Sequence, residues 1–214
     1  ILDDVQNIFS HGEFSGQYKT EYQDYKNFFQ LIIEIKHQSH FILISQEQCS
    51  EMHCLDEELY PIKFLELSGI ENIYLLKNKN LKDQDTWFKL IDLYEGNPIY
   101  LQDIASLIND VYDGYISEFL AEDNLIITTN MQYHFRQLFN RLSSQEKELI
   151  LKLSKFDNAV TREQLRQDLE LSSTDFINCL QSLQRRYLVS KSLNEDKVVF
   201  NLSSVFKEYV RNFC

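Results

Sequence analysis

The sequence has no phosphate-binding loop. It contains five glycines, at Gly12, Gly16, Gly69, Gly96 and Gly114, and none of them is followed by the Lys-Ser or Lys-Thr of the G-x-x-x-x-G-K-[S/T] motif. The backbone amides and the lysine of that motif hold the phosphates of a bound nucleotide. We therefore expect no nucleotide cofactor on this chain alone, and ATPase activity only if such a loop is supplied upstream.

Long apolar runs and a disulfide framework are also missing. No apolar run approaches the roughly 18 residues needed to cross a bilayer, and the N-terminus lacks the basic and then apolar order of a signal peptide. Four cysteines in 214 residues are too few for a secreted domain built on disulfides. These absences predict a cytoplasmic protein with reduced thiols and no membrane partner.

Positive charge is scarce in the first part of the chain. Up to Asn130 there are 8 Lys and Arg against 23 Asp and Glu, a net charge of −15, whereas the remainder has 13 against 10, a net charge of +3. Lys and Arg contacts to phosphates supply most non-specific affinity for nucleic acid. Nucleic acid is therefore not expected as a general partner, and only the last third of the chain has the positive charge to contact DNA.

The chain opens on Ile1-Leu2-Asp3-Asp4-Val5, an apolar strand that ends in two adjacent acids. Paired carboxylates at the end of a buried strand hold Mg²⁺ and orient water in nucleotide hydrolases. The alternative is a helix-capping or solvated acid pair at a strand end. Because the chain starts within a strand and without Met, we interpret it as the C-terminal part of a larger switch protein, with a short, degenerate protein as the alternative.

The first 68 residues have the pattern of an α/β domain. Apolar spacing predicts a helix over Tyr22 to Lys36, followed by a strand over Ser39 to Ser45 whose continuous apolar run is typical of burial on both faces of a parallel sheet. A second strand is predicted over Ile62 to Leu67, entered through Pro61, where a missing amide donor is tolerated. This order predicts the end of a doubly wound sheet.

Residues 69–125 change to a helical pattern. Helices are predicted over 70–79, 84–95, 98–110 and 115–122, and 123–130 is predicted to be a linker. At Gly96-Asn97-Pro98, glycine suits a left-handed cap, asparagine accepts hydrogen bonds from unpaired amides, and proline suits the first helical position. We expect two helices to meet there at a sharp corner.

Residues 126–214 have the element order of a winged helix. Helices are predicted over 131–142, 144–156, 161–169 and 174–187, followed by a hairpin with its turn at 194–196 and a closing helix to Cys214. Thr161 and Ser173 are the predicted N-caps. DNA readers contact bases from the start of the recognition helix, where Asp175 would repel phosphate. A packing module is therefore favoured over a DNA reader, although Arg185, Arg186 and Lys191 form a small basic cluster at the far end.

In their order and in their amino-acid sequence, these segments resemble the STAND class of P-loop NTPases. The resemblance is specifically to NB-ARC modules that precede WD-repeat arrays in cyanobacterial signalling proteins. Residues 1–5 resemble the Walker B strand, residues 37–46 resemble the sensor strand, and residues 65–70 lie where the family reads Leu-x-x-Leu. Tyr94-Glu-Gly-Asn-Pro-Ile-Tyr-Leu101 is similar to the GLPLAL segment, and residues 140–147, 180–188 and 200–209 are similar to the winged-helix part.

The resemblance implies a mainly α fold with a partial α/β sheet and three domains. These are the C-terminal part of a P-loop domain over 1–68, an ARC-like helical domain over 69–125, and a winged-helix domain over 126–214. Asp3 would bind Mg²⁺ and the nucleotide, Asp4 would orient water as the catalytic acid, and Ser45 and Pro98 would line the nucleotide site. ADP or ATP with Mg²⁺ is the implied cofactor of the full-length protein.

Three departures from the family pattern bear on that site. The phosphate-binding loop is missing, Gln46 stands where an arginine usually reaches the γ-phosphate, and Leu202-Ser203-Ser204 aligns with the motif whose histidine contacts the ADP phosphate. Charge-assisted hydrogen bonds of this kind contribute roughly 1.5 to 3 kcal/mol each. This chain alone is therefore predicted not to hydrolyse ATP.

The leading hypothesis is a regulatory NTPase module that works as a nucleotide-dependent switch or oligomerisation platform. Its expected partners are other domains of the same protein, protein partners or further copies of itself. The alternatives are a winged-helix transcription regulator with an acidic sensor domain and a nucleotide-free interaction scaffold. Cys49, His53 and Cys54 lie close in sequence, but zinc sites usually need four ligands and no second pair is present, so no metal is expected there.

Overall fold

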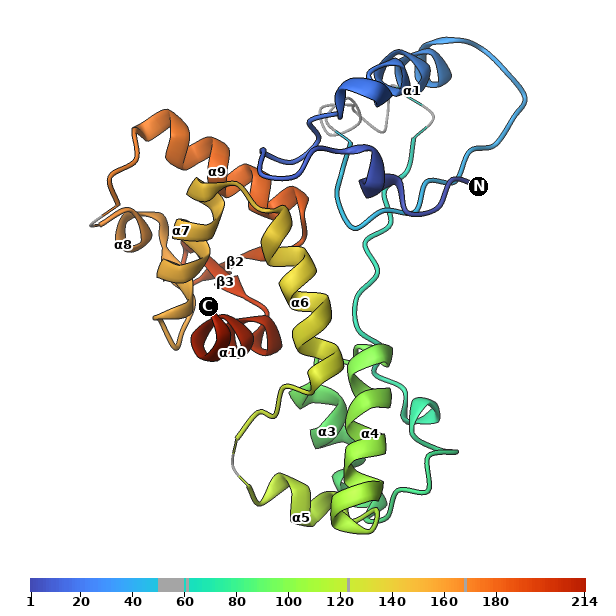
Figure 1. The fold of residues 1–214 in the computed structure, drawn as a ribbon, viewed down its shortest axis with the longest axis vertical. Helices are drawn as coiled ribbons and strands as arrows, with labels where there is room; N and C mark the ends of the chain where they lie inside the picture. The colour runs from blue at the N-terminus through green and yellow to red at the C-terminus, as the bar shows by residue number, and fades with distance from the viewer. Residues whose placement is uncertain (50–59, 61, 123, 168) are drawn as a thin grey trace. The chain divides into compact units, whose positions relative to one another are not determined.

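The computed structural model describes residues 1–49, 60, 62–122, 124–167 and 169–214. It is mostly helical, with a small three-stranded antiparallel sheet, which confirms the expected fold class (Figure 1). The chain divides into two compact units. The first unit comprises residues 1–65 and 139–202, and the second comprises residues 66–138 and 203–214.

In the first unit, residues 1–49 form a small core of their own, which we call the N-terminal segment. A 3₁₀ turn over Val5–Ile8 and a second over Thr20–Tyr22 lead into helix α1, Asp24–Glu34. The helix confirms the predicted one, with shorter ends. The buried side chains of this core are Val5, Phe9, Tyr18, Phe29 and Cys49, with Leu2, Ile8, Ile32 and Leu43 packed against them.

The predicted strand over Ser39 to Ser45 is reduced to one parallel bridge between Leu2 and Leu43. The Leu2 amide donates to the Ile42 carbonyl at 2.8 Å, and the Ile44 amide donates to the Leu2 carbonyl at 2.9 Å. The expected burial on both faces is wrong, because Phe41, Ile42 and Ile44 are 43%, 54% and 48% exposed. A strand is buried only when neighbouring strands and covering helices flank it, and among the described residues Leu2 is its one bridge partner.

The predicted strand over Ile62 to Leu67 is absent, and Pro61 lies outside the described residues. Leu65 and Leu67 are each 83% exposed. Alternating apolar residues form a strand only when another strand supplies the hydrogen-bond ladder, and no strand is assigned over residues 62–67. This prediction was wrong because the pairing partner is not encoded locally.

The second unit is helical. It contains α3 over Trp87–Leu93, α4 over Pro98–Tyr112, α5 over Ile116–Leu120, α10 over Ser204–Phe213 and most of α6, Thr129–Arg141. Three of these, α3, α4 and α5, match the predicted helices 84–95, 98–110 and 115–122 within a few residues. Helices α6 and α10 pack together through Phe135, whose ring centroid lies 5.3 Å from that of Phe206 and 5.2 Å from that of Tyr209.

The helix predicted over 70–79 is instead a single 3₁₀ turn, Ile73–Leu75, followed by turns. Asn72 caps this turn by accepting from the Tyr74 amide at 2.9 Å. Leu76 is buried, but Tyr74 is 67% exposed. Short helices are held mainly by tertiary packing of an apolar face, and one buried leucine does not provide such a face.

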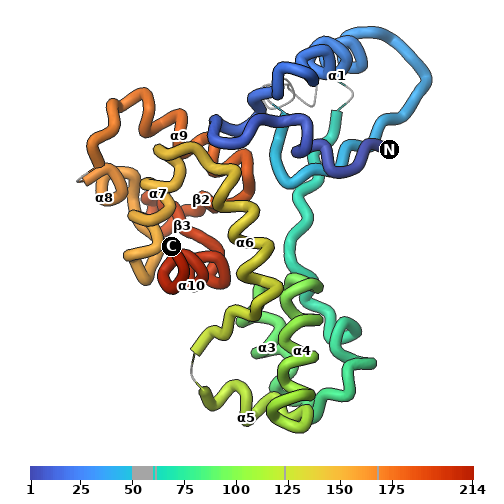
Figure 2. The backbone as a smooth tube through the Cα atoms, in the orientation of Figure 1, coloured from blue at the N-terminus to red at the C-terminus, as the bar shows by residue number. Residues whose placement is uncertain are grey.

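The rest of the first unit has the predicted order of helix, turn, helix and hairpin. It contains α7 over Ser144–Ser154, β1 over Val160–Thr161, α8 over Arg162–Arg166, α9 over Ser173–Arg185, β2 over Val189–Asn194 and β3 over Lys197–Leu202. Figure 2 traces this path from α7 to the hairpin. The strands form an antiparallel sheet in the order β1-β3-β2. We call residues 143–202 the helix-hairpin module.

Local capping fixes the helix starts of this module. Ser143 and Glu146 form a capping box before α7, and Thr161 and Gln164 form one before α8, which confirms the Thr161 prediction. The cap of α9 is Ser172, whose hydroxyl accepts from the Asp175 amide at 3.1 Å, and Ser173 is already the first helical residue. The Ser173 prediction was therefore wrong by one position, because two adjacent serines offer the same capping chemistry.

Candidate functional site

The strand-end acids lie directly after the Leu2 bridge. Asp3 and Asp4 are both exposed, and Asp4 has a left-handed backbone with φ of 54°. The Asp4 amide donates to Asp3 Oδ1 at 2.9 Å. Gln6 Nε2 donates to Asp4 Oδ1 at 2.7 Å. One carboxylate is thus bound to the backbone and the other to a neighbouring side chain.

Gln6 connects these acids to the end of the Leu43 segment. Its side chain is buried, and its Oε1 accepts from the Gln46 amide at 3.1 Å while its Nε2 binds Asp4. Ser45, the adjacent residue, donates its hydroxyl to the Glu47 carbonyl at 2.7 Å. The structure therefore brings the segments of Asp4 and Ser45 together. The sequence reasoning missed Gln6. Its position two residues after Asp4 places an amide side chain within reach of the Asp4 carboxylate and could have indicated this contact.

Asp3 is also predicted to bind Mg²⁺. Among the described residues, no group of three or more His, Cys, Asp and Glu is placed to hold a metal ion. Hydrated Mg²⁺ needs only one or two protein carboxylates together with substrate phosphates. The role of Asp3 in binding Mg²⁺ therefore stays a prediction. Of the Cys49, His53 and Cys54 group, Cys49 is buried in the N-terminal segment, and His53 and Cys54 lie outside the described residues.

The predicted corner at Gly96-Asn97-Pro98 is present in the second unit. Gly96 has a left-handed φ of 62°, Asn97 Oδ1 accepts from the Ile99 amide at 3.0 Å, and Pro98 is the first residue of α4. A Cβ on Gly96 would lie 2.6 Å from the Ile70 nitrogen, so glycine is required for this close approach. Pro98 is exposed, whereas Asp3, Asp4 and Ser45 belong to the first unit.

Glu95 joins this corner to the start of α10. Its carboxylate accepts from the Ser203 hydroxyl at 2.6 Å and from the Ser204 amide at 2.5 Å. A carboxylate at the first turn of a helix also interacts favourably with the positive end of the helix dipole. Two segments that the resemblance assigns to a nucleotide site, the Pro98 corner and Leu202-Ser203-Ser204, are thus tied together by an acid that the sequence reasoning did not single out.

A buried ionic cluster lies between the N-terminal segment and the helices that follow it. Arg186 Nη1 lies 2.7 Å from Glu47 Oε2, and Arg186 Nε lies 3.1 Å from Glu146 Oε1. Arg141 Nη2 lies 2.8 Å from Glu47 Oε2. The side chains of Glu47, Glu146 and Arg186 are 2%, 0% and 4% exposed. Two arginines and two glutamates form a charge-balanced group, which we call the ionic cluster.

Neutral groups also donate hydrogen bonds to the two glutamates of the ionic cluster, although the Arg141 Nε atom is buried without a partner among the described residues. Gly16 donates its amide to Glu47 Oε1 at 2.8 Å, and Ser182 donates its hydroxyl to Glu146 Oε1 at 2.6 Å. Arg186 Nη2 donates to the Glu13 carbonyl at 2.7 Å. Buried charges are tolerated when they are paired and hydrogen-bonded in this way. Sequence reasoning grouped Arg186 with Arg185 and Lys191 in a small basic cluster at the far end of the helix, and in the structure the Arg186 charge is buried and paired with two glutamates.

The electrostatics of Glu47 are dominated by its burial. Burial raises the pKa of the Glu47 carboxyl above its ordinary value, and Arg186, the Gly16 amide and Arg141 act in the opposite direction. Burial likewise lowers the pKa of the Arg141 guanidinium. The buried charges of Glu47 and Arg141 are therefore each unfavourable when unpaired, and their ion pairs offset the loss of hydration.

Further polar contacts join the N-terminal segment to the later helices. In addition to the ionic cluster, the Ser15 amide donates to Ser182 Oγ at 2.6 Å and the Gln48 amide donates to the Arg185 carbonyl at 3.0 Å. The Arg141 Nη2 atom also donates to the Gln6 carbonyl at 3.2 Å. Gln6 thus contacts both the strand-end acid Asp4 and the ionic cluster. We refer to this set of contacts as the polar joint.

Comparison with known proteins finds a relative among curated sequences. The chain is 32% identical over 221 residues to an uncharacterized WD repeat-containing protein from Nostoc sp., and the match includes 99% of the chain. It includes 17% of that protein, so the chain spans less than a fifth of its relative's length. No protein-family model matches. The resemblance inferred from sequence is supported in its coarser form, a likeness to a WD repeat-containing protein.

The described residues include no helix that is both long enough and apolar enough to cross a membrane.

Proposed function

We propose that this chain is the C-terminal part of a regulatory NB-ARC NTPase module, which acts in the cytoplasm as a nucleotide-dependent conformational switch. In this proposal the P-loop is supplied by a preceding segment, Asp3 helps to hold Mg²⁺, and Asp4 orients the attacking water. Ser45 lines the nucleotide site beside these acids, and contact of Pro98 with the nucleotide is proposed separately. The output is a change in contacts with other domains, protein partners or further copies of the protein.

The observation that carries this proposal is the connection between the strand-end acids and the ionic cluster. Gln6 binds Asp4 through its side chain and Arg141 through its carbonyl, and Arg141 binds Glu47. A change in charge at Asp4 would therefore act on a residue that also touches the joint. A switch needs such a contact between its ligand site and the element that it repositions.

The polar character of the joint is a second supporting point. A joint made of ion pairs and amide hydrogen bonds can separate without exposing a large apolar surface to water, whereas parting an apolar core would be far more costly. The apolar residues of the N-terminal segment instead pack in their own cluster around Phe9 and Phe29. An apolar core within the N-terminal segment and polar contacts at its boundary suit a segment that separates from the later helices and rejoins them.

Calorimetric titration with ADP and Mg²⁺ tests the proposal. A longer chain that continues upstream of Ile1 through a phosphate-binding loop should bind in the micromolar range, and the 214-residue chain should not. In the longer chain, Asp3→Asn should weaken Mg²⁺-dependent ATP binding, whereas Asp24→Asn, an exposed acid in the first turn of α1, should leave it unchanged. Micromolar binding by the short chain would contradict our placement of the phosphate site, and no binding by the longer chain would remove the nucleotide switch.

DNA binding is the second candidate function, and the exposed Arg162 favours it. The side chain of Arg162 is 62% exposed on α8, in the part of the chain with net positive charge. Gel-shift measurements on residues 131–214 at two salt concentrations separate the candidates, because phosphate contacts make binding salt-dependent. Tight, sequence-selective binding would favour a transcription regulator. Absence of both DNA and nucleotide binding would leave an interaction scaffold.

A further inference from the structure

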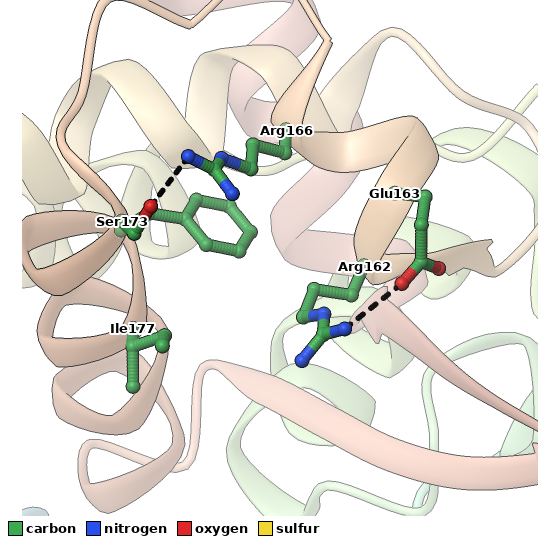
Figure 3. A pocket seen from close by; sticks show the side chains of 6 residues that line it. Arg162, Glu163, Arg166, Ser173 and Ile177 are labelled. Atoms are coloured by element: carbon green, nitrogen blue, oxygen red, sulfur yellow. Dashed lines mark hydrogen bonds and ion pairs between the residues drawn. The ribbon is translucent and has the colours of Figure 1, made fainter.

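A small hollow opens between α8 and the first turns of α9. It has a volume of about 220 Å³. Figure 3 shows Arg162 and Arg166 projecting from α8 and Ser173 and Ile177 facing them from α9. The lining residues are Arg162, Glu163, Arg166, Ser173, Phe176 and Ile177.

The positive wall of the hollow consists of Arg162 and Arg166, which lie four positions apart on α8. Arg166 Nη2 donates to Ser173 Oγ at 2.6 Å, which fixes its direction. Arg162 Nη2 lies 3.1 Å from Oε1 of the adjacent Glu163, and these two side chains are 62% and 70% exposed. An ion pair so exposed contributes little to stability. Arg162 can therefore exchange Glu163 for an incoming anion at small cost.

The opposite wall, on α9, has an apolar part beside Ser173. Phe176 is buried beneath it, whereas Ile177, on the next position of α9, is 46% exposed. An exposed branched apolar side chain beside two guanidinium groups provides a contact for the apolar part of a ligand. Recognition sites commonly pair a small apolar surface with a few placed polar groups in this way.

From these features we infer that the hollow binds an acidic peptide segment, with a carboxylate on Arg162 and Arg166 and a neighbouring bulky apolar side chain against Ile177. The volume is smaller than the roughly 300 to 1,000 Å³ of pockets that enclose drug-sized ligands, so it suits one or two side chains of a peptide. Planar guanidinium groups bind carboxylates in two-pronged geometry.

Neighbouring acids favour a peptide over nucleic acid. Glu163 lines the hollow, and Asp175 lies in the first turn of α9. A continuous polyanion laid along α9 would meet these carboxylates, whereas a peptide needs to place only one or two charges between the arginines. The inference concerns a different site from the nucleotide proposal and does not depend on it.

Fluorescence anisotropy with a fluorescein-labelled Gly-Glu-Glu-Phe-Glu-Gly peptide and the full 214-residue chain tests the inference. We expect saturable binding that is lost when the peptide carries Gln for Glu. The double variant Arg162→Gln with Arg166→Gln should weaken binding by about tenfold or more, because each lost charge-assisted bond affects affinity on this scale. The double variant Lys191→Gln with Lys197→Gln removes the same charge from the exposed hairpin and should bind as the unaltered chain does.

A second pair of variants tests the apolar wall. Ile177→Ser should weaken the peptide by several-fold, as expected when a contact of about 1 kcal/mol is lost, while Leu193→Ser, at a position that is 77% exposed on the hairpin, should not. Circular dichroism would confirm that each variant is folded. Absence of peptide binding, or equal weakening by the lysine pair, would overturn the inference. So would displacement of the peptide by short duplex DNA with a steep salt dependence, which would identify the site as a nucleic-acid face.

Discussion

Replacing Arg186 by Met should destabilise the first unit strongly. The Arg186 side chain is 4% exposed, and its three donors reach Glu47, Glu146 and the Glu13 carbonyl. Met keeps most of the aliphatic stem but leaves two buried carboxylates without their shared cation. Removing one partner from a buried ion pair costs about 3 to 5 kcal/mol because a charge stays buried without compensation. That loss is a large fraction of the total stability of an ordinary domain.

The matched control is Arg162→Met at the exposed Arg162–Glu163 pair. The substitution is the same, but these side chains are 62% and 70% exposed, so water already solvates the remaining glutamate. Urea unfolding followed by far-ultraviolet circular dichroism gives the free energy for each variant. Trp87, the single tryptophan, is buried in the second unit, and its fluorescence provides a separate signal for that unit.

The loss in Arg186→Met should depend on pH with a definite sign. Arg186 lowers the pKa of Glu47, so without Arg186 the folded-state pKa of this carboxyl should rise further above the ordinary 4.5. The folded variant then holds protons more tightly than the unfolded chain, so its deficit relative to the unaltered protein should shrink as the pH falls from neutral towards 4.5. A loss no larger than that of Arg162→Met, or one that does not change with pH, would refute our account of the ionic cluster.

Three further predictions concern single groups. In the unaltered chain, carbon-13 NMR titration of the Glu47 carboxyl should give a pKa above 4.5, and the contribution of this group to stability should decline as the pH rises from 4.5 through that pKa; a midpoint at or below 4.5 would be inconsistent with it. Glu95→Gln should cost about 1 kcal/mol and speed amide hydrogen exchange at residues 203–206, whereas the exposed Asp92→Asn should do neither. Burial raises the pKa of the Cys179 thiol to about 12, so its alkylation at neutral pH should proceed only at the rate of unfolding, and rapid labelling of the native chain would argue against the buried position.

Sequence reasoning was most successful where structure is set by neighbouring residues. The Asn97-Pro98 start of α4 and the Thr161 cap of α8 are both present. The hairpin turn is present as well, with Glu195 and Asp196 both at positive φ. Each of these features depends on hydrogen bonds or backbone preferences within about three residues, and such preferences can be read from a short window.

The predictions that failed concern features that depend on residues far apart in the sequence. The apolar runs 41–44 and 62–67 predict strands from composition, but a strand requires a partner whose identity a single run does not specify. The ionic cluster was missed for the same reason. Glu47 and Arg186 are 139 positions apart, and charged residues are almost never fully buried unless they are paired. Nothing local distinguishes these two from the many solvated charges of this chain.

The position of Gln6 gives the proposed switch a physical route. If Mg²⁺ and a nucleotide gather at Asp3 and Asp4, the Asp4 carboxylate is drawn towards the cation, and its hydrogen bond with Gln6 must compete with that attraction. Gln6 also accepts from the Gln46 amide, one residue before Glu47, and its carbonyl accepts from Arg141. A shift of Gln6 would therefore disturb Arg141 and the backbone beside Glu47, and these two residues form an ion pair at Glu47 Oε2. Burial already makes the Glu47 charge energetically unfavourable. A small weakening of its ion pairs would therefore shift the equilibrium between the joined and the separated state of the polar joint.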